Sequence, residues 1–397
     1  MSSSRMKILV CLVCVLTQSM VFPQTCDFRG QALTWLTITD IKLADTQWGL
    51  RYIPELSLHQ PLSGRFSLDA EVSINAYGSG LFHRLDDVEK DGKVKPYRMW
   101  IRFSSSRFEA RIGLQKINFG SSALLRPLMW FDRIDPRDPL QLTDGVYGIL
   151  LRTYFLNNAN IWLWGLYGND ETKGWEMIPT YDASVEYGGR IQYPVPRGEI
   201  AVSYHHRRID LERGVAQVLA LAGMPDLDPA LVGNFIDLDI IHEDRIGLDG
   251  KWDVTVGVWA EGALVHQDIV GIPYEYQRSI NLGIDYTFGL GNGLHVLYEH
   301  FWYDIAEKAL GKGEGFEFSA LSLNYPIGFL DNVMGMVYYD WENHDWYRFI
   351  RWQRTYDRWS IYGMGFWNPE QFQIYQNLTE NNLFAGKGFQ LMVVFNH

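Results

Sequence analysis

Residues 66–76 read Phe-Ser-Leu-Asp-Ala-Glu-Val-Ser-Ile-Asn-Ala, with apolar side chains at even positions and polar side chains at odd positions. A strand places successive side chains on opposite faces, so this period of two predicts one apolar and one polar face. The pattern returns in residues 280–288 and in residues 389–395. It predicts a chain of strands that each separate an apolar environment from a polar one.

Similar segments follow one another from residue 49 to residue 396. We count about seventeen candidate strands there, and residues 33–41 could add one more. Single-chain bacterial barrels usually have even strand numbers, so we predict about 16 strands, with 14–18 as the range. The predicted fold is all-β: a single antiparallel transmembrane β-barrel with long inward or capping loops, formed by residues 49–397 and preceded by an N-terminal segment, residues 25–48.

The composition favours a membrane barrel over other classes. Aromatic residues make up 15% of the chain, with 15 Trp and 22 Tyr, the residue types that form the girdles of outer-membrane barrels. No stretch approaches eighteen consecutive apolar residues, so we expect no spanning helix. The net charge of −12 argues against a nucleic-acid partner, which requires a basic footprint.

The first residues are typical of a secretory signal. Arg5 and Lys7 precede an apolar run over residues 8–16, which is too short to span a bilayer. We therefore expect residues 1–24 to be a signal peptide and the protein to be exported to the outer membrane of a Gram-negative cell. Cys26 would be the one cysteine left, so no intramolecular disulfide is expected.

Two connections do not fit a simple succession of hairpins. Residues 120–145 are rich in charges and aromatics, and residues 209–243 contain two stretches with helical character, residues 211–222 and 229–235. Connections of this length are usually functional or disordered, and these contain too many apolar residues to be disordered. The first is a candidate constriction loop, and the second is a partly helical loop that could serve as a plug or a docking surface.

The alternation also assigns charges to faces. An Arg or Lys that faces lipid at the bilayer midplane costs about 2–4 kcal/mol, so charged faces must point into the barrel lumen. The sequence places seven charged residues on such faces of neighbouring strands, and we predict that they line a pore: Asp69, Glu71, Arg98, Arg102, Arg107, Glu109 and Arg111. Alternatively, these charges pair with one another and fill the interior.

Within residues 120–145, acids and bases alternate along a segment that Pro127, Pro136 and Pro139 stiffen. If the loop folds inward to cover its apolar residues, its charges would narrow the pore. If it stays outside, they would pair locally. The candidate constriction residues are Arg126, Asp132, Arg133, Asp135, Arg137 and Asp138.

Motifs of enzymes and metal sites are missing from the sequence. It contains neither G-x-S-x-G nor H-E-x-x-H, and the paired acids Asp226/Asp228 and Asp237/Asp239 lack the Gly and the distant Glu of a calcium loop. We therefore expect no enzymatic activity, no cofactor and no metal site.

One region resembles a known family. Residues 111–120 read Arg-Ile-Gly-Leu-Gln-Lys-Ile-Asn-Phe-Gly, and Arg-Pro-Leu-Met-Trp-Phe-Asp (126–132) and Asp-Pro-Arg-Asp-Pro (135–139) follow. This run resembles the porin-like outer-membrane proteins of the Bacteroidetes and related bacteria. The resemblance implies a barrel of about 14–18 strands and passive or substrate-preferring diffusion, with no catalytic residues. The chain departs from many outer-membrane proteins by ending on Asn396-His397 rather than on an aromatic residue.

Two hypotheses for function remain open. The first is an outer-membrane porin-like channel for passive diffusion of small polar or anionic solutes, surrounded by outer-membrane lipid, as a monomer or homotrimer. The second is a plugged barrel that acts as a structural or assembly partner of other outer-membrane proteins, in a surface or secretion complex. The path of the long loops decides between them.

Overall fold

The computed structural model describes residues 25–40, 46–62, 64–84, 87–221, 240–269, 272–369 and 384–397. Over these residues the chain forms one 18-stranded antiparallel sheet and one helix, α2 (Leu211–Leu221). The strands are β1 (Thr25–Thr39), β2 (Thr46–Pro61), β3 (Ser67–Arg84), β4 (Asp87–Ser104), β5 (Phe108–Gln115), β6 (Val146–Tyr154), β7 (Asn160–Tyr167), β8 (Val185–Val195), β9 (Gly198–Asp210), β10 (Ile240–Asp253), β11 (Gly257–Gln267), β12 (Tyr276–Phe288), β13 (Leu294–Ala306), β14 (Gly313–Ile327), β15 (Asp331–Asp340), β16 (Trp346–Thr355), β17 (Trp359–Trp367) and β18 (Lys387–Asn396).

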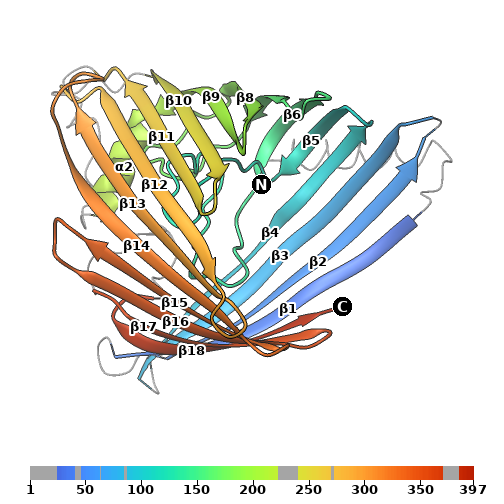
Figure 1. Cartoon of the computed structure of the whole chain (residues 1–397), viewed down its shortest axis with the longest axis vertical. Helices are drawn as coiled ribbons and strands as arrows, with labels where there is room; N and C mark the ends of the chain where they lie inside the picture. Colours follow the sequence, from blue (N-terminus) through green and yellow to red (C-terminus); the bar gives the residue numbers. More distant parts are fainter. Residues whose placement is uncertain are drawn as a thin grey trace.

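The sheet closes on itself. Each strand pairs with its neighbours in sequence, and β1 also pairs with β18, from Gln31 opposite Asn396 to Thr39 opposite Gly388 (Figure 1). Closure leaves no free sheet edge, which is what a spanning β structure requires in a solvent without hydrogen-bond partners. The predicted single antiparallel barrel is confirmed. No helix among the described residues has the length and apolar character to cross a membrane.

The predicted strand number of about 16 was wrong, because the barrel has 18 strands. Residues 25–48 are not a separate segment: β1 lies in them, and its pairing with β18 closes the barrel. The sequence also hid β16, whose residues Trp346-Tyr-Arg-Phe-Ile-Arg-Trp carry aromatics and arginines on both faces. The candidate helix at 229–235 lies outside the described residues, whereas the helix expected at 211–222 is α2.

The two rims of the barrel differ in the length of their connections. Short turns join each even-numbered strand to the next, and the shortest is the two-residue turn between β8 and β9. The longest described connections, residues 116–145 and 168–184, leave from the opposite rim. Outer-membrane barrels have short periplasmic turns and longer extracellular loops, which orients the long-loop rim outward. Residues 78–84 and 87–95 extend the β3–β4 hairpin.

Successive side chains along a strand alternate between the outer and the inner face of the barrel. In β12, Ile280 and Leu282 are 45% and 55% exposed on the outer face, while Asn281 between them is fully buried on the inner face. On β11 and β18 the inner face likewise carries the buried polar residues Glu261 and Gln390. The outside is therefore apolar where lipid would lie, and the polar groups are inside, as the cost of lipid-facing charge demands.

Tryptophans mark the two edges of the apolar outer band. Outward-facing Trp346 and Trp367 lie near the long-loop rim, and Trp352 and Trp359 lie near the short-turn rim. Trp and Tyr concentrate where a membrane meets water. These residues therefore give the level of both membrane interfaces on the barrel surface.

Candidate functional site

The connection between β5 and β6, residues 116–145, folds into the barrel rather than over its outside. Its apolar residues Leu125, Leu128, Trp130 and Phe131 are each at most 4% exposed, and Figure 1 shows the chain crossing the interior after β5. Leu124 and Leu125 join a core with inner-face residues of β13–β18, and Trp130 joins a second core beside Trp164. Burial of these apolar side chains stabilises the position of the loop inside the lumen.

Glu261 on the inner face of β11 holds the first part of this loop. Its Oε2 accepts hydrogen bonds from the backbone N–H groups of Ser121 (2.7 Å) and Ser122 (2.8 Å), and its Oε1 accepts one from Leu128 (2.7 Å). Successive backbone N–H groups that converge in this way form an anion-binding concavity.

Glu299 on β13 does the same for the next residues. Its carboxylate accepts hydrogen bonds from the backbone N–H groups of Ala123 (2.7 Å), Leu124 (3.0 Å) and Leu125 (2.6 Å), and from the indole of Trp259 (3.0 Å). Neither Glu261 nor Glu299 forms an ion pair within the described part of the chain. Two wall carboxylates thus anchor the loop through its backbone, not through its side chains.

The six predicted constriction residues mostly pair within the loop or with its neighbour. Arg126 contacts Asp132 at 3.4 Å and also donates to the Asn118 side chain at 2.5 Å. Burial raises the pKa of the Asp132 carboxyl, although Arg126 opposes this effect. The loop is inside, as predicted, yet these two charges pair locally, which was the expectation for an outside loop.

The remaining candidate constriction residues also bind partners within the loop or in the neighbouring connection. Arg137 makes a two-point contact with Asp135, the shortest at 2.8 Å, and Asp138 accepts hydrogen bonds from the backbone of Leu140 and Leu142. Burial raises the pKa of Asp138. Arg133 donates to Gly174 O (2.9 Å) and Thr172 Oγ1 (3.0 Å) of the connection between β7 and β8. These residues shape the loop, and their role as a constriction remains a proposal.

That neighbouring connection, residues 168–184, is a second inward loop that the sequence did not reveal. Its Glu176 is buried between Arg207 (3.1 Å) and Arg245 (2.8 Å), both on inner faces, and these arginines also bind Glu243. Its Trp175 donates to the carbonyl of Arg126 in the first loop at 2.8 Å. The alternation in the sequence places Arg207 and Arg245 on the inner face. It could not show that Glu176, from a distant loop, lies between them.

The predicted pore-lining residues largely come together on β3–β5. Arg102 contacts Asp69 at 3.1 Å, and Glu109 lies 2.9 Å from Arg111 and 4.0 Å from Arg102. Glu71 is half-buried on the same face of β3 as Asp69. Arg98 is buried and donates to the carbonyl of Thr143 at 2.9 Å, so it meets the end of the first loop.

Arg107 is an exception among the predicted pore-lining residues. It lies in the short turn between β4 and β5 and is exposed, so it belongs to the rim and not to the lumen wall. The prediction continued the alternating pattern of β5 beyond the start of this strand at Phe108, into the turn that joins it to β4.

Three further cations stand on or near this wall and were not among the predicted site residues. Arg152 on β6 stacks 3.8 Å from the Trp162 ring and lies 3.9 Å from Glu109. Arg51 on β2 lies 5.1 Å from the Tyr77 ring, and Lys116 follows β5 at the base of the first loop. Burial lowers the pKa of the Lys116 amine.

Aromatic rings hold several of these guanidiniums in place. Arg111 lies 4.6 Å from the Trp100 ring, which Arg102 also approaches at 5.7 Å. A cation stacked on a ring face keeps its in-plane N–H donors free for an anion. We call these six cations the basic wall: Arg51, Arg98, Arg102, Arg111, Arg152 and Lys116.

Charges farther around the wall, on β8, β10 and the connection between β7 and β8, are neutralised in pairs. Arg190 makes a two-point contact with Asp249, at 2.5 and 2.9 Å, and Lys173 contacts Glu186 at 3.1 Å. In the basic wall, by contrast, the single carboxylate of Glu109 faces three guanidiniums. Cationic character therefore gathers on one side of the interior.

Known proteins resemble this chain in structure, not in sequence. No family model matches the chain, and no curated protein matches it. Solved structures do: OccK2 (OpdF) of Pseudomonas aeruginosa in complex with glucuronate has a TM-score of 0.57 at 10% identity, covering 94% of this chain and 97% of that chain. The chain has the fold of porin-type outer-membrane β-barrels.

Two further solved structures have the same barrel fold. OccAB4 of Acinetobacter baumannii has a TM-score of 0.53 at 8% identity, covering 94% of this chain and 98% of that chain. OmpT, an outer-membrane protein of Vibrio cholerae solved in a trimer form, has a TM-score of 0.52 at 12% identity, covering 94% and 99%. Identities this low establish the fold alone, so the affiliation with the Bacteroidetes family stays a prediction.

Proposed function

We propose that this protein is an outer-membrane channel through which small anionic solutes diffuse passively. The observation that carries the proposal is the basic wall, a set of cations on and beside β2–β6 in which guanidiniums outnumber the carboxylates they touch. Rings of fixed charge on a lumen wall select the sign of the solute that passes. Because the wall is fixed to strands and stacked on rings, its charge is preorganised.

The inward loops supply the second requirement of a selective channel, which is a narrow passage. The loop of residues 116–145 is anchored on β11 and β13 by Glu261 and Glu299, while its end reaches Arg98 on β4. It therefore divides the lumen and directs solutes toward the basic wall. A carboxylate passing there would meet N–H donors of Arg102, Arg111 and Arg152, for which charge-assisted hydrogen bonds are the strong recognition mode.

Sugar acids fit this lining better than inorganic anions alone. A sugar acid carries one carboxylate for a guanidinium and several hydroxyls for the half-buried acids Asp69 and Glu71 and for ordered water. The OccK2 structure contains glucuronate, and this compound is a suitable probe for the present chain. A homotrimer in the outer membrane is compatible with the fold, and the porin-like Bacteroidetes family is our candidate for its affiliation.

A plugged barrel is the second candidate function. Two inward loops with buried polar anchors, Glu176 between Arg207 and Arg245 among them, could close the lumen. Such a barrel would act as an assembly partner and would conduct no ions.

Planar-bilayer recording of refolded protein separates the two functions. A channel gives discrete conductance steps, and glucuronate added to one side should transiently block chloride current by occupying the basic wall. Conductance steps without a glucuronate effect would limit the function to a non-specific pore. Absence of steps, together with co-purification of stoichiometric partners, would favour the plugged barrel.

A further inference from the structure

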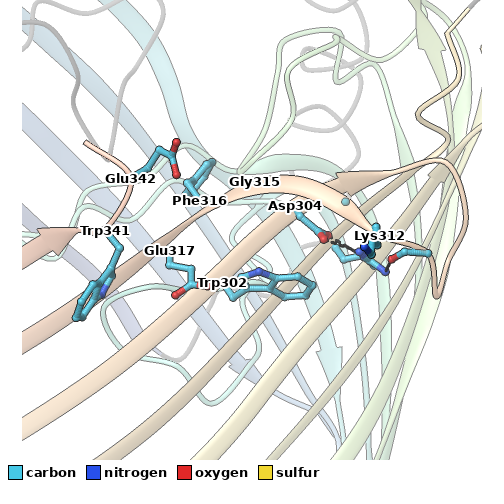
Figure 2. A pocket seen from close by; sticks show the side chains of 11 residues that line it. Trp302, Asp304, Lys312, Gly315, Phe316, Glu317, Trp341 and Glu342 are labelled. Carbon is cyan, nitrogen blue, oxygen red and sulfur yellow. Dashed lines mark hydrogen bonds and ion pairs between the residues drawn. The ribbon is translucent and has the colours of Figure 1, made fainter. Parts of the chain in front are cut away.

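A hollow of about 690 Å³ lies on the outer surface of the barrel near the long-loop rim, away from the lumen. It extends from β12 to the turn after β15, and Arg278, Trp302 and Glu317 line it from outward positions of β12–β14 (Figure 2). Its size falls within the range of small-molecule sites, about 300–1,000 Å³. It belongs neither to the basic wall nor to the inward loops.

Glycines create the hollow. Gly313 and Gly315 occupy outward positions of β14, where other residues would project side chains. A Cβ at Gly313 would lie 2.3 Å from the Asp304 carboxylate, and one at Gly315 would lie 1.9 Å from the Tyr303 carbonyl. Only glycine allows this approach of β14 to β13, and the result is an open floor of backbone.

Two indoles stand on either side of a carboxylate above this floor. Glu317 on β14 is the register partner of Trp302 on β13, and its carbonyl accepts a hydrogen bond from the backbone of Trp341 at 3.1 Å. Figure 2 shows Glu317 between the two rings. The two tryptophans are therefore two strand spacings apart, roughly 10 Å, which leaves room for one six-membered ring between them.

The polar groups of the hollow are arranged to leave some of them free for a ligand. Arg278 and Asp304 bind each other, and Arg278 also donates to Ala309 O and Gly311 O at 3.0 Å, which fixes the β13–β14 turn. Glu317 lies 3.6 Å from His300 Nε2 through one carboxylate oxygen, yet 49% of its side chain is exposed, and Lys312 and Glu342 are exposed at the edge. Carboxylates accept hydrogen bonds from hydroxyls, and a lysine binds phosphate as a point charge.

The position of the hollow identifies its surroundings. Trp341 and Trp346 belong to the girdle at the long-loop rim, where headgroups of the outward leaflet lie. Arg278 stacks over one face of Trp302 at 5.4 Å, which leaves the face toward Trp341 available. A ligand here is held by indole faces, a carboxylate acceptor and a cation at headgroup level.

We propose that this hollow binds the sugar headgroup of a glycolipid in the outward leaflet. A pyranose ring lies between Trp302 and Trp341, its hydroxyls donate to Glu317, and a headgroup phosphate meets Lys312. The site rests on the proposed orientation of the barrel but not on conduction, so it can be tested when no current is measured.

Native mass spectrometry of the whole barrel in detergent tests the proposal. The probes are purified deep-rough lipopolysaccharide, its deacylated headgroup and, as a lipid without sugar, phosphatidylglycerol. The variants are Trp341→Ala and Glu317→Gln, with Trp359→Ala as the matched control in the opposite girdle. We expect each site variant to bind lipopolysaccharide and its headgroup about tenfold more weakly, because each loses a stacking face or a charged acceptor, while Trp359→Ala binds like the wild type.

Two results would overturn the proposal. If all variants retain lipopolysaccharide equally, the tryptophans serve only as interface anchors. If phosphatidylglycerol binds as tightly as lipopolysaccharide and is lost in the same variants, the hollow recognises acyl chains or charge and not sugar.

Discussion

The Oε2 atom of Glu299 accepts a hydrogen bond from the backbone N–H of Leu125 at 2.6 Å, which ties the wall of the barrel to the deepest apolar residue of the inward loop. Together with Glu261 it accepts six hydrogen bonds from the loop backbone, four of them buried and two partly buried. The loop position therefore depends on two side chains that lie far from it in sequence.

Replacing Glu299 should release the loop. In Glu299→Ala three loop N–H groups lose their acceptor, at a cost of about 1–3 kcal/mol each if they stay buried, so the loop will leave this position instead. Trypsin cleavage after Arg133 or Arg137 should become at least about tenfold faster, and single-channel current should become larger and noisier. Glu199→Ala, on the inner face of β9, removes the same charge without a loop contact and should leave both readouts unchanged. Equal cleavage in all three proteins would mean that apolar packing alone holds the loop.

Removing charge from the basic wall should change selectivity. Arg111→Gln and Arg152→Gln each delete a cation beside Glu109, so the preference for chloride over potassium should fall by about twofold to fivefold, with a larger effect in the double variant. Arg348→Gln, on the outer face of β16, is the matched control. The assignment of the wall fails if the control alters selectivity as much as the lumen variants.

The second inward loop should contribute to stability. Glu176 lies between Arg207 and Arg245, and Glu176→Ala would leave one buried guanidinium without full compensation. We expect a loss of about 3 kcal/mol in the free energy of unfolding, measured by urea titration in detergent with the heat-modified gel mobility as readout. The control Glu342→Ala, at an exposed position, should leave the free energy of unfolding unchanged. A loss below about 1 kcal/mol would show that loop and wall are only loosely coupled.

Acidification should increase anion preference through Asp138. Burial raises the pKa of this carboxyl, so Asp138 takes up its proton at a higher pH than an exposed aspartate and the loop loses one negative charge. The chloride preference should therefore rise as pH falls through that raised pKa. Asp138→Asn should show the higher preference already at neutral pH and lose this step. If chloride preference depends on pH in the same way in the wild type and in Asp138→Asn, Asp138 is not the group responsible.

The period of two in residues such as 280–288 was sufficient to predict the barrel and its polar interior, because lipid penalises any other distribution of charge. It failed at β16, where arginines and aromatics occupy both faces, and it indicated only the second half of β1, as a possible strand at residues 33–41. The same pattern placed Arg98, Arg102 and Arg111 on the inner face. It could not show that Glu261 and Glu299 receive backbone N–H groups, since such a contact depends on the path of a loop that follows no period.

Selection of anions by the cations of the lumen wall can be measured as the reversal potential of single channels under a potassium chloride gradient. We expect a potential with the sign of chloride preference, which moves toward zero in the Arg111→Gln/Arg152→Gln double variant. A potential with the sign of potassium preference, unchanged in that variant, would contradict it.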